Sequence, residues 1–385
     1  MGRSTATTLP LRPAAALLSQ KSLVHNLSEV VRMAKRPTRL HRSASQVMAV
    51  IKADAYGHSV EQILPELERQ GIKRFAVASI QEAIEARRFS QKAHLLVLGG
   101  TFSWSTKALE VIEREKLEIA VNDLEALQYF SRRLSIPIHL KLDTGMNRLG
   151  IKPDDWGRAV SILKESKRKL KGLFTHYATS DDSIFERQVS LFEEAVRWFQ
   201  SQNLHPEWVH SENSAALFSE MFQRRRGVLS EVANLVRPGL SLYGYLPTHP
   251  RNSLQPVLEL VSSIELIKRV EVAEGISYGH FYKAKRSHDY GVVPLGYTDG
   301  LSKIYGKVLQ PRWLSKQGIL KGSLSICGSI CMDMVMVRSQ RGKIEPGDRV
   351  IFWGRFPNSL LKEKIIEPYE LNLRISKRIP RLWVK

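Results

Sequence analysis

Cysteine is scarce in this chain, and long apolar runs are missing. Its 385 residues include only two cysteines, Cys327 and Cys331. They do not complete a zinc site, because structural zinc takes four ligands and no further Cys or His pair lies nearby. We therefore expect no metal and a reducing compartment. No stretch approaches the roughly 20 apolar residues that a membrane helix requires, so we also expect no membrane-spanning segment.

The N-terminal stretch lacks the features of an export signal. Arg3 and Arg12 accompany a short apolar piece at residues 14–18, but Pro10 and Pro13 interrupt the stretch. The apolar run is also brief for the central region of a signal peptide. We expect the chain to be cytoplasmic.

Acidic residues are few relative to basic ones. The chain has 58 Lys and Arg against 38 Asp and Glu, which gives a formal net charge of +20. Such an excess can indicate binding to nucleic acid or to acidic surfaces. The basic clusters at 164–171, 224–226 and 374–381 lie in different predicted elements, however, and lack the interleaved aromatic residues of a stacking surface. We expect solvated helix faces here, and no specific nucleic-acid binding.

The order of apolar segments predicts two domains. In the first half, short apolar strands alternate with longer helical stretches such as 183–200, the βαβ pattern of a parallel barrel. The expected strands are residues 75–78, 95–98, 138–142, 173–176 and 208–210. From about residue 253 the pattern changes to period-two stretches, which indicate antiparallel β-structure. We predict an α/β chain with a barrel over residues 1–250 and a mostly β domain over residues 251–385.

Lys52 is the residue with the clearest chemical meaning. It follows Met48, Val50 and Ile51, which predict a buried parallel strand, and precedes a helical pattern at 59–69. The end of a barrel strand is where such folds carry their active sites. Partial burial lowers the pKa of an amine there and suits it to form a Schiff base with an aldehyde cofactor, for which pyridoxal phosphate is the candidate. On these residues alone, a solvated loop lysine is an equally good interpretation.

Lys52 opens the first of several motifs that follow one another along the chain. Residues 52–58 read KADAYGH, 141–150 KLDTGMNRLG, 175–178 THYA, 213–216 NSAA and 237–244 RPGLSLYG. The last third adds ISYG at 276–279, GYTDG at 296–300, CMD at 331–333, PYE at 368–370 and RIPR at 378–381. In this order, and from about residue 45 to the end, they resemble the motifs of the alanine racemase family.

The resemblance implies a fold and a reaction. It implies a TIM-type (β/α)8 barrel with a second β domain, pyridoxal phosphate as cofactor, and interconversion of L- and D-alanine for peptidoglycan synthesis. Racemisation removes a proton from one face of Cα and returns one to the other, so it needs an electron sink, which the cofactor ring supplies, and a base on each face. The resemblance assigns the two bases to Lys52 and Tyr278. In the family, the equivalents of Tyr278 and Met332 come from the partner subunit, which implies a homodimer with shared active sites.

The resemblance also assigns neighbours to the tyrosine. A tyrosine has an ordinary pKa of about 10 and needs groups that favour its phenolate. His176 and Arg237 match the family residues that provide them. Arg237 is further placed against the pyridine nitrogen, where a guanidinium does not readily accept a proton and so suppresses side reactions such as transamination. Taken singly, Arg237 could be a surface arginine before a turn, Tyr278 a packed strand residue and His176 a satisfied core histidine.

Backbone amides and hydroxyls are expected to hold the cofactor phosphate. The resemblance assigns this role to Tyr56, Ser214, Gly239, Leu240 and Tyr369. Ser214 would otherwise be a helix N-cap, which is compatible with phosphate binding.

Other assignments concern the substrate and the entrance to the site. The resemblance implies that Arg148 and the backbone amide of Met332 bind the substrate carboxylate. Lys141 matches a family lysine that is often carbamylated, and an ordinary ion pair with a nearby carboxylate is the alternative. Tyr297 and Asp333 match residues that line the entrance and support the tyrosine loop.

Some positions depart from the family pattern. Ser59 stands where glycine is usual, Lys303 where arginine often follows GYxDG, and Ser329 where arginine is common, while the stretch up to about residue 45 is atypical. These changes could alter cofactor affinity, dimer contacts or rate. A racemase for a larger amino acid, a non-catalytic pyridoxal-phosphate-binding barrel and a basic interaction protein on a retired enzyme scaffold are the alternatives. The presence of both proposed bases and of a second domain favours the catalytic interpretation.

Overall fold

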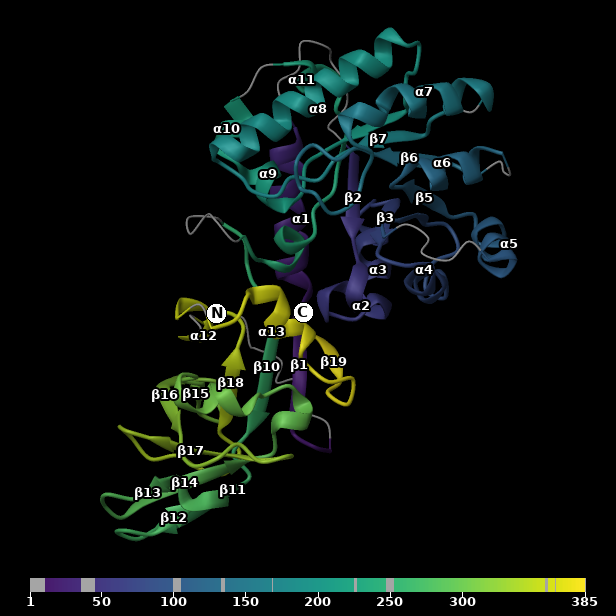
Figure 1. Cartoon of the computed structure of the whole chain (residues 1–385). Coiled ribbons are helices and arrows are strands. Elements are labelled where there is room, and N and C mark those ends of the chain that lie inside the picture. The colour runs from purple at the N-terminus through teal and green to yellow at the C-terminus, as the bar shows by residue number, and fades with distance from the viewer. Residues whose placement is uncertain are drawn as a thin grey trace. The chain divides into compact units, whose positions relative to one another are not determined.

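The chain folds into two compact units. The computed structural model describes residues 11–35, 46–99, 105–132, 136–167, 169–224, 227–246, 253–356, 359–363 and 365–384. One unit is Val24–Leu254, and the other combines Met1–Leu23 with Gln255–Lys385 (Figure 1). The predicted domain boundary at residue 250 lies outside the described residues.

The unit Val24–Leu254 contains a parallel barrel. Its eight strands follow the order β8-β7-β6-β5-β4-β3-β2-β9. They are β2 (Gln46–Val50), β3 (Arg74–Val77), β4 (His94–Val97), β5 (Glu118–Val121), β6 (Ile138–Lys141), β7 (Gly172–Phe174), β8 (Trp208–His210) and β9 (Leu235–Val236). The sheet is nearly closed, because the amide of Asn234 donates to the carbonyl of Val209 at 3.1 Å and the amide of Val209 donates to Asn234 Oδ1 at 3.0 Å. The predicted (β/α)8 barrel is confirmed.

The helices of this unit precede or connect the barrel strands along the chain (Figure 1). They are α1 (Gln20–Ala34), α2 (Lys52–Tyr56), α3 (Val60–Arg69), α4 (Ile80–Arg87), α5 (Thr106–Arg114), α6 (Leu124–Ser131), α7 (Trp156–Glu165), α8 (Ser183–Ser201), α9 (Ser214–Phe218), α10 (Glu220–Arg224) and α11 (Val228–Val232). Ser79, Ser105, Asp123 and Asp182 cap α4, α5, α6 and α8, each accepting from a backbone amide of the first turn. The helix predicted at 183–200 is confirmed.

The second unit is mostly β-structure. A sheet of nine strands has the order β11-β14-β17-β16-β15-β18-β10-β1-β19, and β12 pairs with β13. The elements are β1 (Ala14–Ser19), β10 (Leu258–Ser263), β11 (Leu266–Val270), β12 (Gly275–Ile276), β13 (Tyr282–Lys283), β14 (His288–Val293), β15 (Arg312–Leu314), β16 (Leu320–Ile326), β17 (Val335–Ser339), β18 (Arg349–Trp353), β19 (Arg381–Val384), α12 (Ser359–Lys362) and α13 (Pro368–Leu373).

The N-terminal segment belongs to the β unit, whereas residues 1–250 were all expected in the barrel. Strand β1 pairs antiparallel with β10 and parallel with β19. Residues 14–18 are all apolar and buried, as suits a strand with neighbours on both sides. Cys327 and Cys331 follow β16 outside any strand, and Gly328 between them takes a φ of +84°.

A buried aspartate joins the two ends of the β unit. Asp299 is fully buried. Its carboxylate accepts from Arg12 Nη1 at 2.7 Å and Nη2 at 2.6 Å, from Arg378 Nε at 2.6 Å and from the Gly296 amide at 2.8 Å. The N-terminal and C-terminal arginines are thus fixed to the loop that carries the GYTDG motif.

We expect Asp299→Asn to destabilise the protein by about 3 kcal/mol, because it leaves two arginines without their shared charge. The midpoint of urea unfolding, followed by circular dichroism, measures the effect. Asp289→Asn is the control, since Asp289 is exposed and its nearest contact with Arg269 is 3.6 Å, where an ion pair contributes little. Equal effects of the two substitutions would contradict this role of Asp299.

Candidate active site

Lys52 lies directly after β2 and begins α2. Its side chain is half-buried, and its Nζ lies 5.9 Å from the centre of the Tyr56 ring. Burial lowers the pKa of the amine, and the charge of Arg148 lowers it further, while Glu82 opposes both. A larger fraction of this amine is therefore neutral, and so nucleophilic, than in an exposed lysine.

The backbone after Lys52 forms a left-handed turn. Four consecutive residues, Ala53 to Tyr56, have φ between +52° and +54°. Such a conformation costs roughly 1–2 kcal/mol per L-residue, so it must be held by other contacts. The Ala53 amide donates to Glu82 Oε1 at 2.9 Å, and Asp54 Oδ1 accepts from the Val60 amide at 2.7 Å. Strain of this kind is concentrated at functional sites, and the sequence did not reveal it because the turn contains no glycine before Gly57.

The departure at Ser59 belongs to the same turn. Ser59 has φ of +72°, a region that glycine adopts without steric cost. A serine here adds backbone strain at the start of α3. The positive φ at this position therefore explains why glycine is usual there in the family.

Three aromatic rings pack beside this turn. The Tyr243 ring stacks on His58 at 4.5 Å and lies 5.1 Å from the Tyr56 ring, and its hydroxyl donates to the Val50 carbonyl at 3.1 Å. Gly239 faces Tyr56 so closely that a Cβ at that position would lie 2.7 Å from the Tyr56 hydroxyl. Tyr243 lies within the RPGLSLYG motif, but no role was predicted for it from the sequence.

Ser214 contacts Gly239, another of the predicted phosphate ligands. Its Oγ accepts from the Gly239 amide at 3.0 Å, from the Ser241 amide at 3.1 Å and from the Ser241 hydroxyl at 3.0 Å. The N-cap of α9 is Asn213, which accepts from the Ala216 amide at 2.9 Å, so Ser214 is not the cap. Ser214 and Gly239, far apart in sequence, thus lie in one hydrogen-bonded cluster.

Several positive groups lie near enough to one another for their charges to shift each other's pKa. Lys141 is 6% exposed, and burial, followed by the charges of Arg148 and Arg237, lowers its pKa to about 8. Burial and the same cations lower the pKa of His176 well below its ordinary value, so this imidazole is neutral at pH 7. A site that places several cations together is suited to an anionic ligand. Pyridoxal phosphate, with its phosphate group, and an amino acid, with its carboxylate, both fit this requirement.

Arg237 is a buried side chain, so the surface interpretation is wrong. Its guanidinium hydrogen-bonds His210 Nδ1 at 2.5 Å and donates to the Thr175 carbonyl at 2.6 Å. It also lies 5.1 Å from the centre of the Phe174 ring. Burial lowers its pKa to about 10, so it remains charged at neutral pH.

The loop of the second motif carries Arg148. Asp143 Oδ1 accepts from the amides of Gly145 and Asn147, both at 3.0 Å. Gly150 has φ of +124°, and a Cβ there would lie 2.6 Å from the Asp143 amide. This tight loop leaves Arg148 exposed, and its charge acts on Lys52, Lys141 and His176.

We expect Lys141→Met to stabilise the cofactor-free protein by about 1–3 kcal/mol at about pH 7, because it removes a buried amine that must be charged below a pKa of about 8. The folded-state pKa lies below the ordinary 10.5, so the unfolded chain binds the extra proton between these values. The free energy of unfolding of the wild type then rises with pH across this window. The extra stability of the Lys141→Met variant over the wild type should therefore shrink. Urea unfolding in bicarbonate-free buffer at about pH 7 and about pH 10 measures this, with the exposed Lys152→Met as control. A loss of stability at the lower pH would contradict the prediction.

The remaining predicted residues lie in the β unit. Tyr278 is 75% exposed and Met332 is 52% exposed. Tyr278 sits in a tight turn between Ser277 and Gly279, which have φ of +67° and +70°. Tyr297 and Tyr369 are partly exposed as well. That these residues share an active site with Lys52 stays a prediction.

Neighbouring contacts explain how the turn and the entrance residues are held. Ser329 donates through its hydroxyl to the Tyr278 carbonyl at 3.0 Å, so this departure from the family pattern supports the tyrosine turn. Lys303 Nζ lies 4.9 Å from the centre of the Tyr297 ring. Asp333 pairs with Arg378 and accepts from the Thr298 hydroxyl at 3.3 Å.

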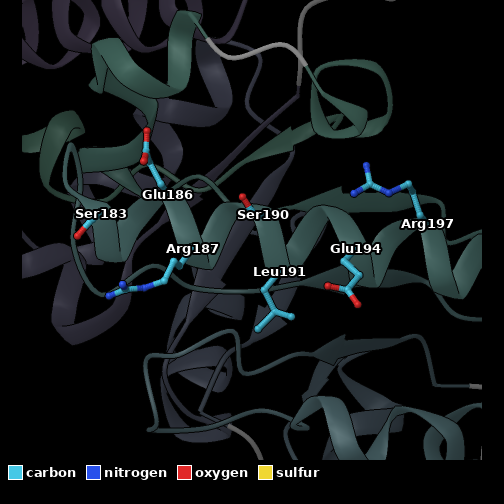
Figure 2. A pocket seen from close by; sticks show the side chains of 7 residues that line it. All are labelled: Ser183, Glu186, Arg187, Ser190, Leu191, Glu194 and Arg197. Carbon is cyan, nitrogen blue, oxygen red and sulfur yellow. The ribbon is translucent and has the colours of Figure 1, made fainter.

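A hollow of about 730 Å³ runs along α8 (Figure 2). Glu186, Arg187, Glu194 and Arg197 are among its lining residues, all of which belong to that helix. It includes none of the predicted site residues, and its mixed charges are typical of a solvated helix face. Among the described residues, no cluster of three His, Cys, Asp or Glu side chains could hold a metal ion, and no helix there is long and apolar enough to cross a membrane.

A nearly closed parallel barrel with a half-buried lysine after a strand, a cationic site and a separate β unit defines a two-domain barrel enzyme. Known proteins identify it further. The alanine racemase N-terminal domain model matches residues 18–247, and the C-terminal domain model matches residues 257–383. The alanine racemase of Geobacter sulfurreducens is 32% identical over 97% of each chain, and that of Treponema denticola is 29% identical over 97% of this chain and 99% of that relative. The chain belongs to the alanine racemase family.

Solved structures agree with this assignment. The alanine racemase of Clostridium difficile 630 has a TM-score of 0.82 with this chain at 29% identity, covering 97% of this chain and 96% of that one. The biosynthetic alanine racemase of Pseudomonas aeruginosa has a TM-score of 0.79 at 27% identity, covering 97% and 100%. The chain is therefore an enzyme, an amino-acid racemase.

Proposed function

We propose that this enzyme interconverts L- and D-alanine with pyridoxal phosphate by a two-base mechanism, and that it supplies D-alanine for peptidoglycan in the cytoplasm. The observation that supports the proposal is that Lys52, Lys141, Arg148 and Arg237 all lie near enough to His176 for their charges to lower its pKa. The reaction itself is proposed from membership of the alanine racemase family. The bound cofactor would provide the electron sink for the Cα carbanion.

Residues of the barrel would hold the cofactor. Lys52 would bind its aldehyde carbon, since its amine is half-buried with a lowered pKa. The hydroxyls of Tyr56 and Ser214, with the amides of Gly239 and Leu240 and the hydroxyl of Tyr369, would hold its phosphate. Arg237 would donate to the pyridine nitrogen from a buried position where it stays protonated.

The substrate would be held and deprotonated by groups from both units. Arg148 and the amide of Met332 would bind its carboxylate. Lys52 would take or return the proton on one face of Cα and Tyr278 on the other, with His176 and Arg237 favouring the phenolate. Tyr278 is exposed in the single chain, which suits a residue that completes the site of a partner subunit. We therefore propose a homodimer with shared sites, in which Tyr297 and Asp333 line the entrance and Lys141, once carbamylated, positions Arg148 through its negative charge.

A substrate panel tests the proposal. We expect the purified enzyme with pyridoxal phosphate to racemise alanine with a higher kcat/KM than serine, valine or lysine, as measured by chiral chromatography of both enantiomers. A higher value for a larger amino acid would favour the alternative racemase. Cofactor binding without turnover of any of them would favour a non-catalytic barrel.

A further inference from the structure

Five buried polar side chains form one continuous hydrogen-bonded line inside the barrel. They are Arg237, His210, His139, Glu118 and Arg74, and each is buried. Arg237 Nη1 meets His210 Nδ1 at 2.5 Å, His210 Nε2 meets His139 Nδ1 at 2.9 Å, and His139 Nε2 meets Glu118 Oε2 at 2.9 Å. Arg74 Nη1 donates to Glu118 Oε1 at 3.2 Å. The line therefore leads from the proposed cofactor site to a carboxylate at the start of β5.

The chemistry of the two ends sets the position of every proton in the line. A guanidinium has only donors, so His210 Nδ1 must accept and its Nε2 must carry the hydrogen. His139 Nδ1 then accepts from His210, and His139 Nε2–H donates to Glu118. Burial lowers the pKa of His139, and lowers that of His210 well below its ordinary value, so both rings are neutral. Burial alone would raise the pKa of Glu118, but the hydrogen bond from His139 and the charge of Arg74 outweigh it.

The surrounding residues fit this arrangement closely. Gly172 leaves room for the His139 ring, since a Cβ at that position would lie 2.1 Å from His139 Nδ1. The Phe174 ring stacks on His210 at 4.7 Å with an interplanar angle of 8°. The Arg74 guanidinium lies 4.3 Å from the centre of the Trp208 ring. Neither histidine ring can turn over without losing contacts on both sides.

We propose that Glu118 and His139 are positioning residues for Arg237, which act by holding His210 in the Nε2–H tautomer so that its Nδ1 always accepts from the guanidinium. This proposal rests on the proposed role of Arg237 at the cofactor. If His210 Nδ1 carried the hydrogen instead, its N–H would face the N–H of Arg237 Nη1 and no hydrogen bond could form. Arg237 would then have to move. The line thus fixes the orientation of Arg237, the residue proposed to suppress transamination.

Neutron diffraction of deuterium-exchanged crystals of the enzyme with its cofactor tests the arrangement directly. We expect deuterium on Nε2 and not on Nδ1 of both His139 and His210. Deuterium on Nδ1 of either ring would overturn the proposal. This result needs no variant and no turnover, so it decides the arrangement even if the proposed reaction is wrong.

Glu118→Gln tests the consequence for the reaction. In glutamine one of the two carboxylate oxygens becomes an NH2 group, so it can accept from Arg74 only if its NH2 faces His139. That NH2 needs His139 Nε2 as an acceptor, which favours the Nδ1–H tautomer of His139 and disturbs the whole line. We expect kcat to fall about 10- to 100-fold, as when an outer carboxylate that orients a functional histidine is lost. We also expect a larger fraction of turnovers to end in transamination, measured as pyruvate formed per alanine racemised.

Glu66→Gln is the matched control, because Glu66 is an equally buried carboxylate of the same unit that accepts from Gln70 at 3.0 Å. It should leave the pyruvate ratio unchanged. Equal ratios in both variants would show that Glu118 acts only on stability and would overturn its positioning role. If wild type racemises no amino acid, the proposed function fails, while the neutron result still decides the tautomers.

Discussion

Lys52→Ala is expected to lower alanine racemisation by at least about 1,000-fold and to abolish covalent attachment of the cofactor. Lys52 is the half-buried amine that follows β2, and burial with the charge of Arg148 lowers its pKa. Both its proposed roles, attachment of the cofactor and proton transfer on one face, need a primary amine. Alanine supplies neither.

Two measurements separate these roles. Borohydride reduction followed by peptide mass spectrometry should find the cofactor on the peptide that contains Lys52 in wild type, and on no peptide in the variant. Added methylamine should restore some turnover to Lys52→Ala, because it replaces the missing base. Lys152→Ala, at an exposed lysine of the same unit, is the control for nonspecific labelling. Covalent cofactor on another lysine of the variant would show that Lys52 is not the attachment site.

The barrel strands could be predicted from the sequence more fully than the contacts of the active-site residues. The strands expected at 75–78, 95–98, 138–142 and 208–210 correspond to β3, β4, β6 and β8, because each is an apolar run of its own. Strand β9 comprises only Leu235–Val236, which is too short for any periodicity to be visible. The place of β1 depends on β10 and β19, whose residues lie more than two hundred positions away in the sequence.

The buried polar line was not predicted because its members give no local signal. His139 and His210 each lie in an apolar strand, and their partners come from other strands of the barrel. A histidine in such a run is most simply interpreted as a core residue. The motifs identified Arg237, but the contacts that hold it, to His210 and the Thr175 carbonyl, depend on barrel closure and so appear only in three dimensions.

Tyr278→Phe is expected to lower racemisation about 1,000-fold, within the range for loss of a general base, while leaving proton exchange at Cα for one enantiomer only. Phenylalanine keeps the ring but removes the hydroxyl, and Lys52 would remain on its own face. Proton NMR of L- and D-alanine in deuterium oxide measures exchange for each enantiomer separately. Tyr290→Phe, a partly buried tyrosine of the same unit, is the control. Equal loss of exchange for both enantiomers would contradict the assignment of Tyr278 to one face.

Mixed dimers of Lys52→Ala and Tyr278→Phe subunits test whether the sites are shared. If each site takes Lys52 from one subunit and Tyr278 from the other, one site of the mixed dimer has both defects and the other has none. Co-expression of differently tagged subunits and tandem purification should then yield about half the wild-type kcat per dimer, by the arithmetic of one intact site in two. If each site lies within one chain, both sites carry a defect and activity stays near that of the single variants. The large exposure of Tyr278, at 75% in the single chain, favours the first outcome, because it leaves the side chain accessible to the site of a partner subunit.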